Sequence, residues 1–83
     1  MTDAKAHVAI GNKVVSLTRH VMTRENLSQD VAYSRLMGTD TFKLLSDPET
    51  RMFLEDDDYL FQCYDIESLQ GLDALYAFVK PDP

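Results

Sequence analysis

The first third of the chain carries a repeating apolar pattern that constrains the fold more than any other feature. Residues 4–24 contain no proline, and Ile10, Val14, Leu17 and Val21 follow one another at spacings of four, three and four. This spacing places the four side chains on one stripe of an α-helix. The pattern predicts a long N-terminal helix whose apolar face must be covered by other parts of the chain or by another molecule.

The next segments are divided by residues that start or stop helices. Ser28 is a natural N-cap, and a second helix is predicted from there to Met37, where Gly38 ends it in the left-handed conformation. Its buried face is predicted to consist of three apolar residues: Val31, Ala32 and Leu36. Thr39 or Asp40 then caps a third helix that runs through Leu45.

The second half begins with a stop and a restart at Asp47-Pro48, because proline is tolerated only in the first helical turn. Apolar residues at helical spacing after Asp56 predict a fourth helix, which Gly71 ends. Residues 72–80 fit a last helix, and Tyr76–Val79 fits a short strand equally well.

These segments predict a compact all-α bundle of four to five short helices with a long N-terminal helix, and residues 1–83 are interpreted as a single small helical domain. A chain of 83 residues buries a smaller fraction of its surface than a larger domain does. The apolar face of the first helix is wide for so small a domain, so we expect a homodimer. The predicted dimer interface consists of Val8, Ile10, Val14, Val15, Leu17, Val21 and Met22.

Charge is distributed unevenly along the sequence. The chain has 8 Lys and Arg against 14 Asp and Glu, a net charge of −6, and most of the acidic residues lie in its second half. Such a balance makes nucleic acid an unlikely ligand, because phosphate binding requires excess positive charge. We predict that a partner protein binds the acidic surface formed by Glu55, Asp56, Asp57, Asp58, Asp65 and Glu67.

No pattern of catalytic or metal-binding residues stands out, and the chain is interpreted as a non-enzymatic protein without a cofactor or metal. His7 and His20 are too far apart to share a metal on one helix, and both are expected at the surface. The run that starts at Glu55 lacks the alternating ligands and the glycine of a calcium-binding loop. Cys63 has no second cysteine to pair with and is expected to be a small core residue.

The sequence also bears on two further questions, whether the protein binds DNA and where in the cell it is found. Residues 28–46 have some features of a helix-turn-helix, so a DNA-binding regulator is the alternative function, although Lys43 is the only basic residue of its second helix. No export signal and no membrane-spanning run of apolar residues is visible, so we expect a cytoplasmic protein without a membrane partner.

Residues 41–53 also carry a motif. Thr41-Phe42-Lys43-Leu44-Leu45, followed by Asp47, Glu49-Thr50, Met52-Phe53 and Tyr59-Leu60, resembles a family of small bacterial proteins that is classed as a domain of unknown function. The family's run is T-Y-x-L-L-x-D-x-x-T-x-L-W, and the resemblance spans about residues 27–67. Some of these families neighbour toxin-like enzymes, including ADP-ribosyltransferase-like ones. The resemblance therefore implies an antitoxin or a regulatory partner of such an enzyme, and we adopt that function as our hypothesis.

Overall fold

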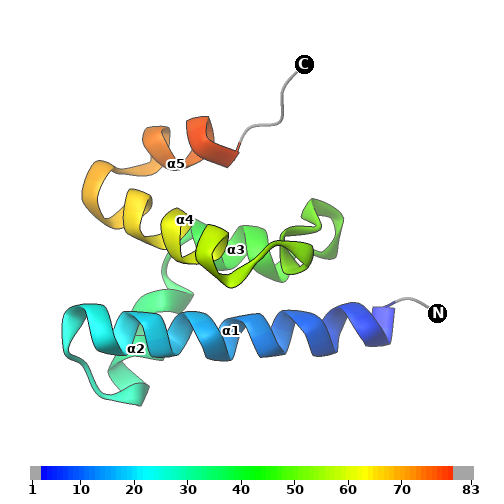
Figure 1. The fold of residues 1–83 in the computed structure, drawn as a ribbon, viewed down its shortest axis with the longest axis horizontal. Helices are drawn as coiled ribbons and strands as arrows, with labels where there is room; N and C mark the ends of the chain where they lie inside the picture. Colours follow the sequence, from blue (N-terminus) through cyan, green and yellow to red (C-terminus); the bar gives the residue numbers. More distant parts are fainter. Residues whose placement is uncertain (1–2, 80–83) are drawn as a thin grey trace.

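A computed structural model describes residues 3–79 of the chain and contains only helices in this range (Figure 1). The elements are, in chain order, α1 (Asp3–Glu25), α2 (Gln29–Met37), α3 (Asp40–Ser46), the 3-10 turns η1 (Pro48–Thr50) and η2 (Met52–Leu54), α4 (Asp57–Gln70) and α5 (Leu72–Val79). The predicted all-α bundle with a long N-terminal helix is confirmed. The segment left open between helix and strand is helical over Leu72–Val79.

The helices form three levels, with α4 in the middle. Figure 1 shows α1 along one side, α4 and α3 above it, and α5 on the side of α4 that faces away from α1. Helix α2 folds back against α1 after a sharp turn at Asn26, whose φ of 56° is in the left-handed region. Helix α5 packs mainly against α4, so much of its surface has no neighbour within the described chain.

The core lies where α1, α2, α3 and α4 meet. Leu17 and Val21 of the predicted α1 stripe are completely buried there, together with the aromatic ring of Tyr64 from α4. Cys63 is buried beside Tyr64, which confirms the prediction that it is a core residue. Burial of each large apolar side chain stabilises the fold by about 1.5–3 kcal/mol, so packing holds these short helices in place.

Two details of α2 differ from the sequence prediction. Val31 is not part of the buried face and is 47% exposed, because only Ala32 and Leu36, which are one turn apart, point into the core. Gly38 has a φ of −84° and does not adopt the left-handed conformation. Its amide donates to the carbonyl of Arg35, so the helix ends in a tighter turn that any residue could adopt.

Several predicted helix boundaries are confirmed by their hydrogen bonds. The Thr39 hydroxyl accepts from the amide of Phe42 at 3.1 Å and caps α3, and the Asp47 carboxylate accepts from the amide of Glu49 at 3.0 Å and caps η1. Gly71 ends α4 with a φ of 93°, a conformation that L side chains rarely adopt. These three residues therefore set the starts of α3 and η1 and the end of α4, whereas Ser28 and Asp56 stand at the N-cap positions of α2 and α4 without a side-chain capping bond.

Within residues 3–79 no helix has both the length and the apolar character that crossing a membrane requires.

Candidate protein-binding site

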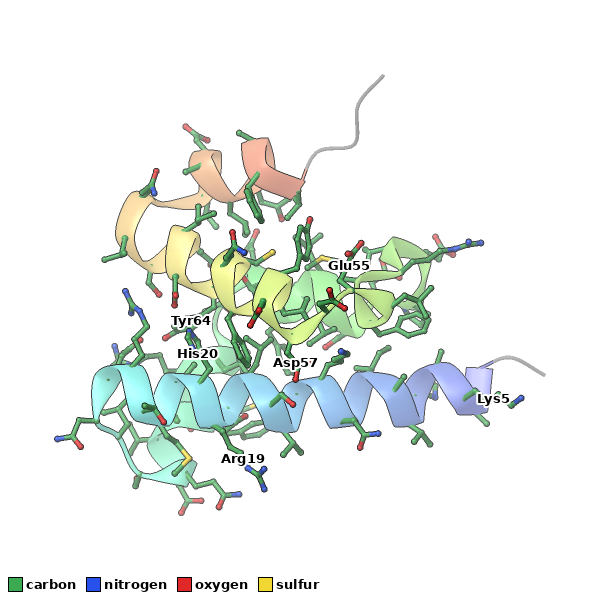
Figure 2. All side chains as sticks on the ribbon, viewed as in Figure 1. Lys5, Arg19, His20, Glu55, Asp57 and Tyr64 are labelled. Atoms are coloured by element: carbon green, nitrogen blue, oxygen red, sulfur yellow. The ribbon has the colours of Figure 1, made fainter. Side chains whose placement is uncertain are left out.

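The structure divides the six residues of the predicted acidic contact surface into two groups. Asp57, Asp65 and Glu67 are bonded to other parts of the chain, whereas Glu55, Asp56 and Asp58 are exposed. In Figure 2, Asp57 lies between the start of α4 and α1, and Glu55 lies on the side of the chain away from α1. Glu55, Asp56 and Asp58 therefore keep unpaired carboxylates at the surface, whereas the carboxylates of the other three already have partners within the chain.

Two of the bonded carboxylates link α4 to α1. The Nζ atom of Lys13 donates to Asp57 Oδ1 at 2.9 Å. Asp65 Oδ1 lies 2.8 Å from His20 Nε2 and 3.0 Å from Arg24 Nε. These contacts join residues more than 40 positions apart in the chain. They connect the two longest helices and pair each carboxylate with a cationic or imidazole group, while the Asp57 side chain keeps 46% of its surface exposed.

His20 is placed differently from the prediction. The ring was expected at the surface, but it lies partly buried between α1 and α4, stacked on the ring of Phe61 at a centroid distance of 4.3 Å. Its Nε2 atom faces Asp65, and Tyr64 lies at its edge (Figure 2). A histidine with an aromatic partner and a carboxylate partner fits the packing between two helices, which is the physical reason for the correction.

Glu67 of α4 binds the first residues of α3, a structural role that the sequence did not reveal. Its two carboxylate oxygens accept from the amides of Asp40 and Thr41, each at 2.9 Å, and from the hydroxyl of Thr41 at 2.7 Å. Thr41 is completely buried. The carboxylate thus satisfies the first free amides of α3 and lies at the positive end of its dipole. Glu67 is removed from the set of residues available to a partner.

This contact also bears on the helix-turn-helix alternative at residues 28–46. Helices α2 and α3 are present and adjacent, as that alternative requires. However, the first amides of α3 are bound to Glu67, and Thr41 is buried against α4, so the start of the helix is not free to contact phosphates or bases. Its single cation, Lys43, lies 3.8 Å from the carboxylate of Asp40.

A second internal carboxylate, Glu25, joins α1, α2 and α4. The hydroxyl of Tyr64 donates to Glu25 Oε2, and Arg35 Nη1 lies 3.2 Å from Glu25 Oε1. Burial, followed by the hydrogen bond to this carboxylate, raises the pKa of Tyr64 to about 12. The tyrosine therefore stays protonated and serves as a donor that fixes the end of α1 against α4.

The remaining carboxylates of the second half form an exposed acidic surface. Residues 44–79 contain nine Asp and Glu and a single cation, Arg51. None of the exposed acidic residues makes an ion pair within the described chain. The surface consists of Asp47, Glu49, Glu55, Asp56 and Asp58, and Asp73 is exposed separately in the first turn of α5. The surface contains the exposed half of the predicted contact set and adds Asp47 and Glu49, which precede it in the chain.

An apolar hollow lies beside this acidic surface, bounded by α3, the two 3-10 turns, α4 and α5. It has a volume of about 750 Å³, and its apolar lining comes from Leu44, Met52, Tyr59 and Val79. Glu49, Thr50, Glu55 and Tyr76 complete the lining. We refer to this feature as the acidic-rimmed hollow, because two carboxylates of the acidic surface lie at its edge.

Local contacts shape the walls of the acidic-rimmed hollow. The ring of Tyr59 is stacked against Phe78 of α5 at a centroid distance of 5.2 Å, and the hydroxyl of Tyr76 donates to Asp40 Oδ2 at 2.7 Å. The Thr50 hydroxyl donates to the carbonyl of Leu44 at 2.6 Å and fixes the chain after η1. Helix α5 is therefore held against α4 and α3 at the side of the hollow.

The hollow has no activated nucleophile. Cys63, one turn along α4 from Tyr59 of the lining, is completely buried, and burial, followed by the charge of Glu55, raises the pKa of its thiol to about 11. Burial is also the main cause that raises the pKa of Tyr59. Both groups are therefore protonated at neutral pH, and a protonated thiol is a poor nucleophile.

The residues of the predicted dimer interface are also divided by the structure. Ile10, Leu17 and Val21 are buried in the core of their own chain, so they are not available to a second copy. Val8 is 65% exposed and Val15 50% exposed. Val14 and Met22 are partly buried against the core. The stripe was assigned to a second molecule because the apolar face of α1 is wide for so small a domain to cover. In the structure, α2, α3 and α4 cover most of this face.

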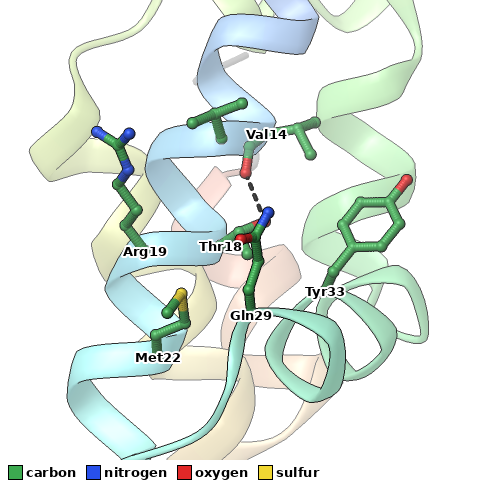
Figure 3. Close-up of a pocket in the computed structure, with 7 residues that line it drawn as sticks. Val14, Thr18, Arg19, Met22, Gln29 and Tyr33 are labelled. Atoms are coloured by element: carbon green, nitrogen blue, oxygen red, sulfur yellow. Dashed lines mark hydrogen bonds between the residues drawn. The ribbon is translucent and has the colours of Figure 1, made fainter.

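A shallow groove between α1 and α2 remains where α1 is not covered. It has a volume of about 400 Å³ (Figure 3). Val14 and Met22 line it from α1, Tyr33 lines it from α2, and Arg19 stands at its edge. The hydroxyl of Thr18 is turned back to the carbonyl of Val14 at 2.8 Å and is satisfied within α1. Association of two copies through this side of α1 stays a prediction.

Comparisons with protein-family models, with curated proteins and with solved structures gave no significant match. The site is therefore interpreted from its own geometry. Within the part of the chain that the structure describes, no group of three or more His, Cys, Asp or Glu side chains is arranged to hold a metal ion.

Sequence reasoning missed the apolar part of the site. It selected the acidic run at Glu55 but not Glu49, Tyr76 or Val79, which come together with it only in the folded chain. The composition of α5 was a signal for this apolar surface. All but one of its eight residues are apolar, although the helix lies at one side of the bundle. A helix that is apolar on all faces requires cover on more than one side.

Proposed function

We propose that this protein is a non-enzymatic protein-binding module that contacts its partner through the acidic-rimmed hollow and the acidic surface around it. One observation carries the proposal: two exposed carboxylates without ion pairs in the described chain, Glu49 and Glu55, line an apolar hollow. Apolar surface supplies binding free energy, and unpaired surface charge selects and orients the partner.

The proposed biological role is that of an antitoxin or regulatory partner of a bacterial toxin-like enzyme. The motif at residues 41–53 supports this role through its resemblance to small bacterial families that neighbour such enzymes. The absence of an activated nucleophile in the hollow agrees with a binding function. An inhibitor of this kind needs only to cover a surface of the enzyme, which a rigid helical domain can do.

The experiment is a pull-down of the tagged protein from a lysate of its own host, with the bound proteins identified by mass spectrometry. The wild-type chain is compared with the triple variant Glu55→Gln, Asp56→Asn and Asp58→Asn. Asp57 is left unchanged because it is bonded to Lys13. One control is Asp30→Lys, which changes the net charge by two at an exposed position of α2, against three in the triple variant.

We expect one stoichiometric partner to be retained by the wild type and the control and to be lost by the triple variant. If that partner is an enzyme, its activity should fall when it binds this protein. Recovery of the tagged chain alone, or a partner retained equally by the triple variant, would overturn the proposal. Recovery of DNA instead would favour a regulator that uses residues 28–46.

A further inference from the structure

We propose that the acidic-rimmed hollow receives the apolar face of a basic amphipathic helix supplied by the partner. This inference rests on the proposed function and adds the chemistry of the segment that the site recognises. Three features of the described chain support it. The apolar surface continues along one face of α5, no sheet edge is present, and the charge at the rim of the hollow is negative.

The apolar surface of the hollow continues along α5. Leu72, Tyr76 and Val79 follow one another at spacings of four and three, so they share one face of this helix. Tyr76 and Val79 line the hollow, and Leu72 extends the same face beyond it, with 48% of its surface exposed. The three residues span about two helical turns, which is about 10 Å. This is the length over which a docked helix presents two or three apolar side chains.

The architecture favours a helix over an extended peptide. Residues 3–79 contain no strand, so no sheet edge is present there to pair with the backbone of a ligand. The Thr50 hydroxyl at the wall already donates to a backbone carbonyl, and the Tyr76 hydroxyl already donates to Asp40. A partner must therefore bind mainly through side chains, as an amphipathic helix does in an apolar groove.

The charge at the rim indicates that the helix is basic. Glu49 and Glu55 lie at the edge of the hollow, and neither forms an ion pair within the described chain. Asp56 and Asp58 lie close along the chain and are also exposed, whereas Arg51 is the only cation of residues 44–79. An acidic helix would be repelled, but lysines or arginines beside the apolar face would pair with these carboxylates.

The test uses a synthetic helical peptide of about 18 residues, or five turns, with leucines along one face and lysines on the other. Its binding is measured by fluorescence anisotropy, and the site is mapped by chemical-shift changes in the protein. The probe controls are a peptide in which glutamates replace the lysines and a scrambled lysine–leucine peptide without an apolar face.

Two pairs of variants separate the site from general charge. Glu49→Gln with Glu55→Gln removes the rim carboxylates, and Asp30→Asn with Asp73→Asn removes the same charge from outside the hollow lining. We expect the first pair to weaken binding of the basic peptide about fivefold or more and the second pair less than about twofold, as rim ion pairs of this kind allow. All these residues are exposed, and circular dichroism checks that each variant is folded.

The expected map has its largest shifts at Leu44, Met52, Tyr59 and Val79. Three results would overturn the inference: equal loss of binding in both variant pairs, equal binding of the glutamate or scrambled peptide, or shifts centred on the groove between α1 and α2. If the peptide fails while a lysate partner is still lost by the triple variant, the partner-binding function stands and the basic helix is rejected. If both experiments fail, the proposed function falls as well.

Discussion

Removal of the Glu67 carboxylate should destabilise the fold strongly, although the sequence gives no sign that this residue is structural. It accepts three hydrogen bonds, from the amides of Asp40 and Thr41 at 2.9 Å and from the Thr41 hydroxyl at 2.7 Å. A hydrogen bond to a charged group contributes about 1.5–3 kcal/mol, and loss of a helix cap costs about 0.5–2 kcal/mol.

The cost of Glu67→Ala is smaller than the sum of these values. Water can replace the carboxylate more readily at Asp40, a partly exposed residue, than at Thr41, which is completely buried. We expect a loss of about 2–4 kcal/mol, a large part of the roughly 4–12 kcal/mol that a domain of this size has. Glu67→Gln keeps one acceptor oxygen but turns an amide donor toward another donor, so about 1–2 kcal/mol is expected.

The assay is urea unfolding followed by circular dichroism, with Glu55→Ala as the control because this residue is exposed and makes no ion pair in the described chain. The melting temperature should fall by about 4–8 °C for each kcal/mol lost. In a double-mutant cycle with Thr41→Val, the two losses should not add, and the coupling should be about 1 kcal/mol. A loss below about 0.5 kcal/mol for Glu67→Ala, or additive losses, would refute the reasoning.

Three further predictions separate exposed from constrained positions. Gly11→Ala should stabilise the protein by about 0.5–1 kcal/mol, because the space beside Gly11 on the helix is open. Gly71→Ala should destabilise the protein by about 1 kcal/mol or more, because φ is 93° there. Urea unfolding compares the two variants, and an equal effect would contradict the conformations described for these glycines. Leu17→Ala should cost about 2–5 kcal/mol and Val15→Ala less than about 0.5 kcal/mol in the same assay; similar costs would show that α1 is not packed as described. Tyr64→Phe should cost about 1–2 kcal/mol at neutral pH. Because the folded pKa is raised from 10.0 to about 12, this contribution is complete below pH 10 and is lost as pH rises through 12. A wild-type protein whose stability falls no more than that of the variant over this range would refute the assignment.

Much of the fold could be predicted because its signals are local. The apolar stripe of α1 and the helix stop at Gly71 each depend on residues within a few positions of one another. The same reasoning failed at Val31, because an apolar residue on a short helix can lie beside the buried face as easily as within it. It also assigned too much of α1 to a second molecule, since the number of helices that would cover the stripe cannot be read from the stripe itself.

The candidate site was only half predictable. Local sequence showed that the run after Leu54 is acidic, but it did not distinguish Glu55, which is exposed, from Asp57, which is bonded to Lys13. It also could not bring Tyr76 and Glu49 into the lining of one hollow, because that arrangement depends on how α5 packs against α4.

The sequence by itself determined the helices, most of their ends and the acidic character of the second half, because these properties arise from neighbouring residues and from composition. Only the tertiary structure decided which carboxylates are bound internally and which line the hollow. Asp65 meets His20 across 45 positions, and Glu67 meets Thr41 across 26. Such pairings depend on the packing of whole helices against one another, and no local spacing in the chain encodes them.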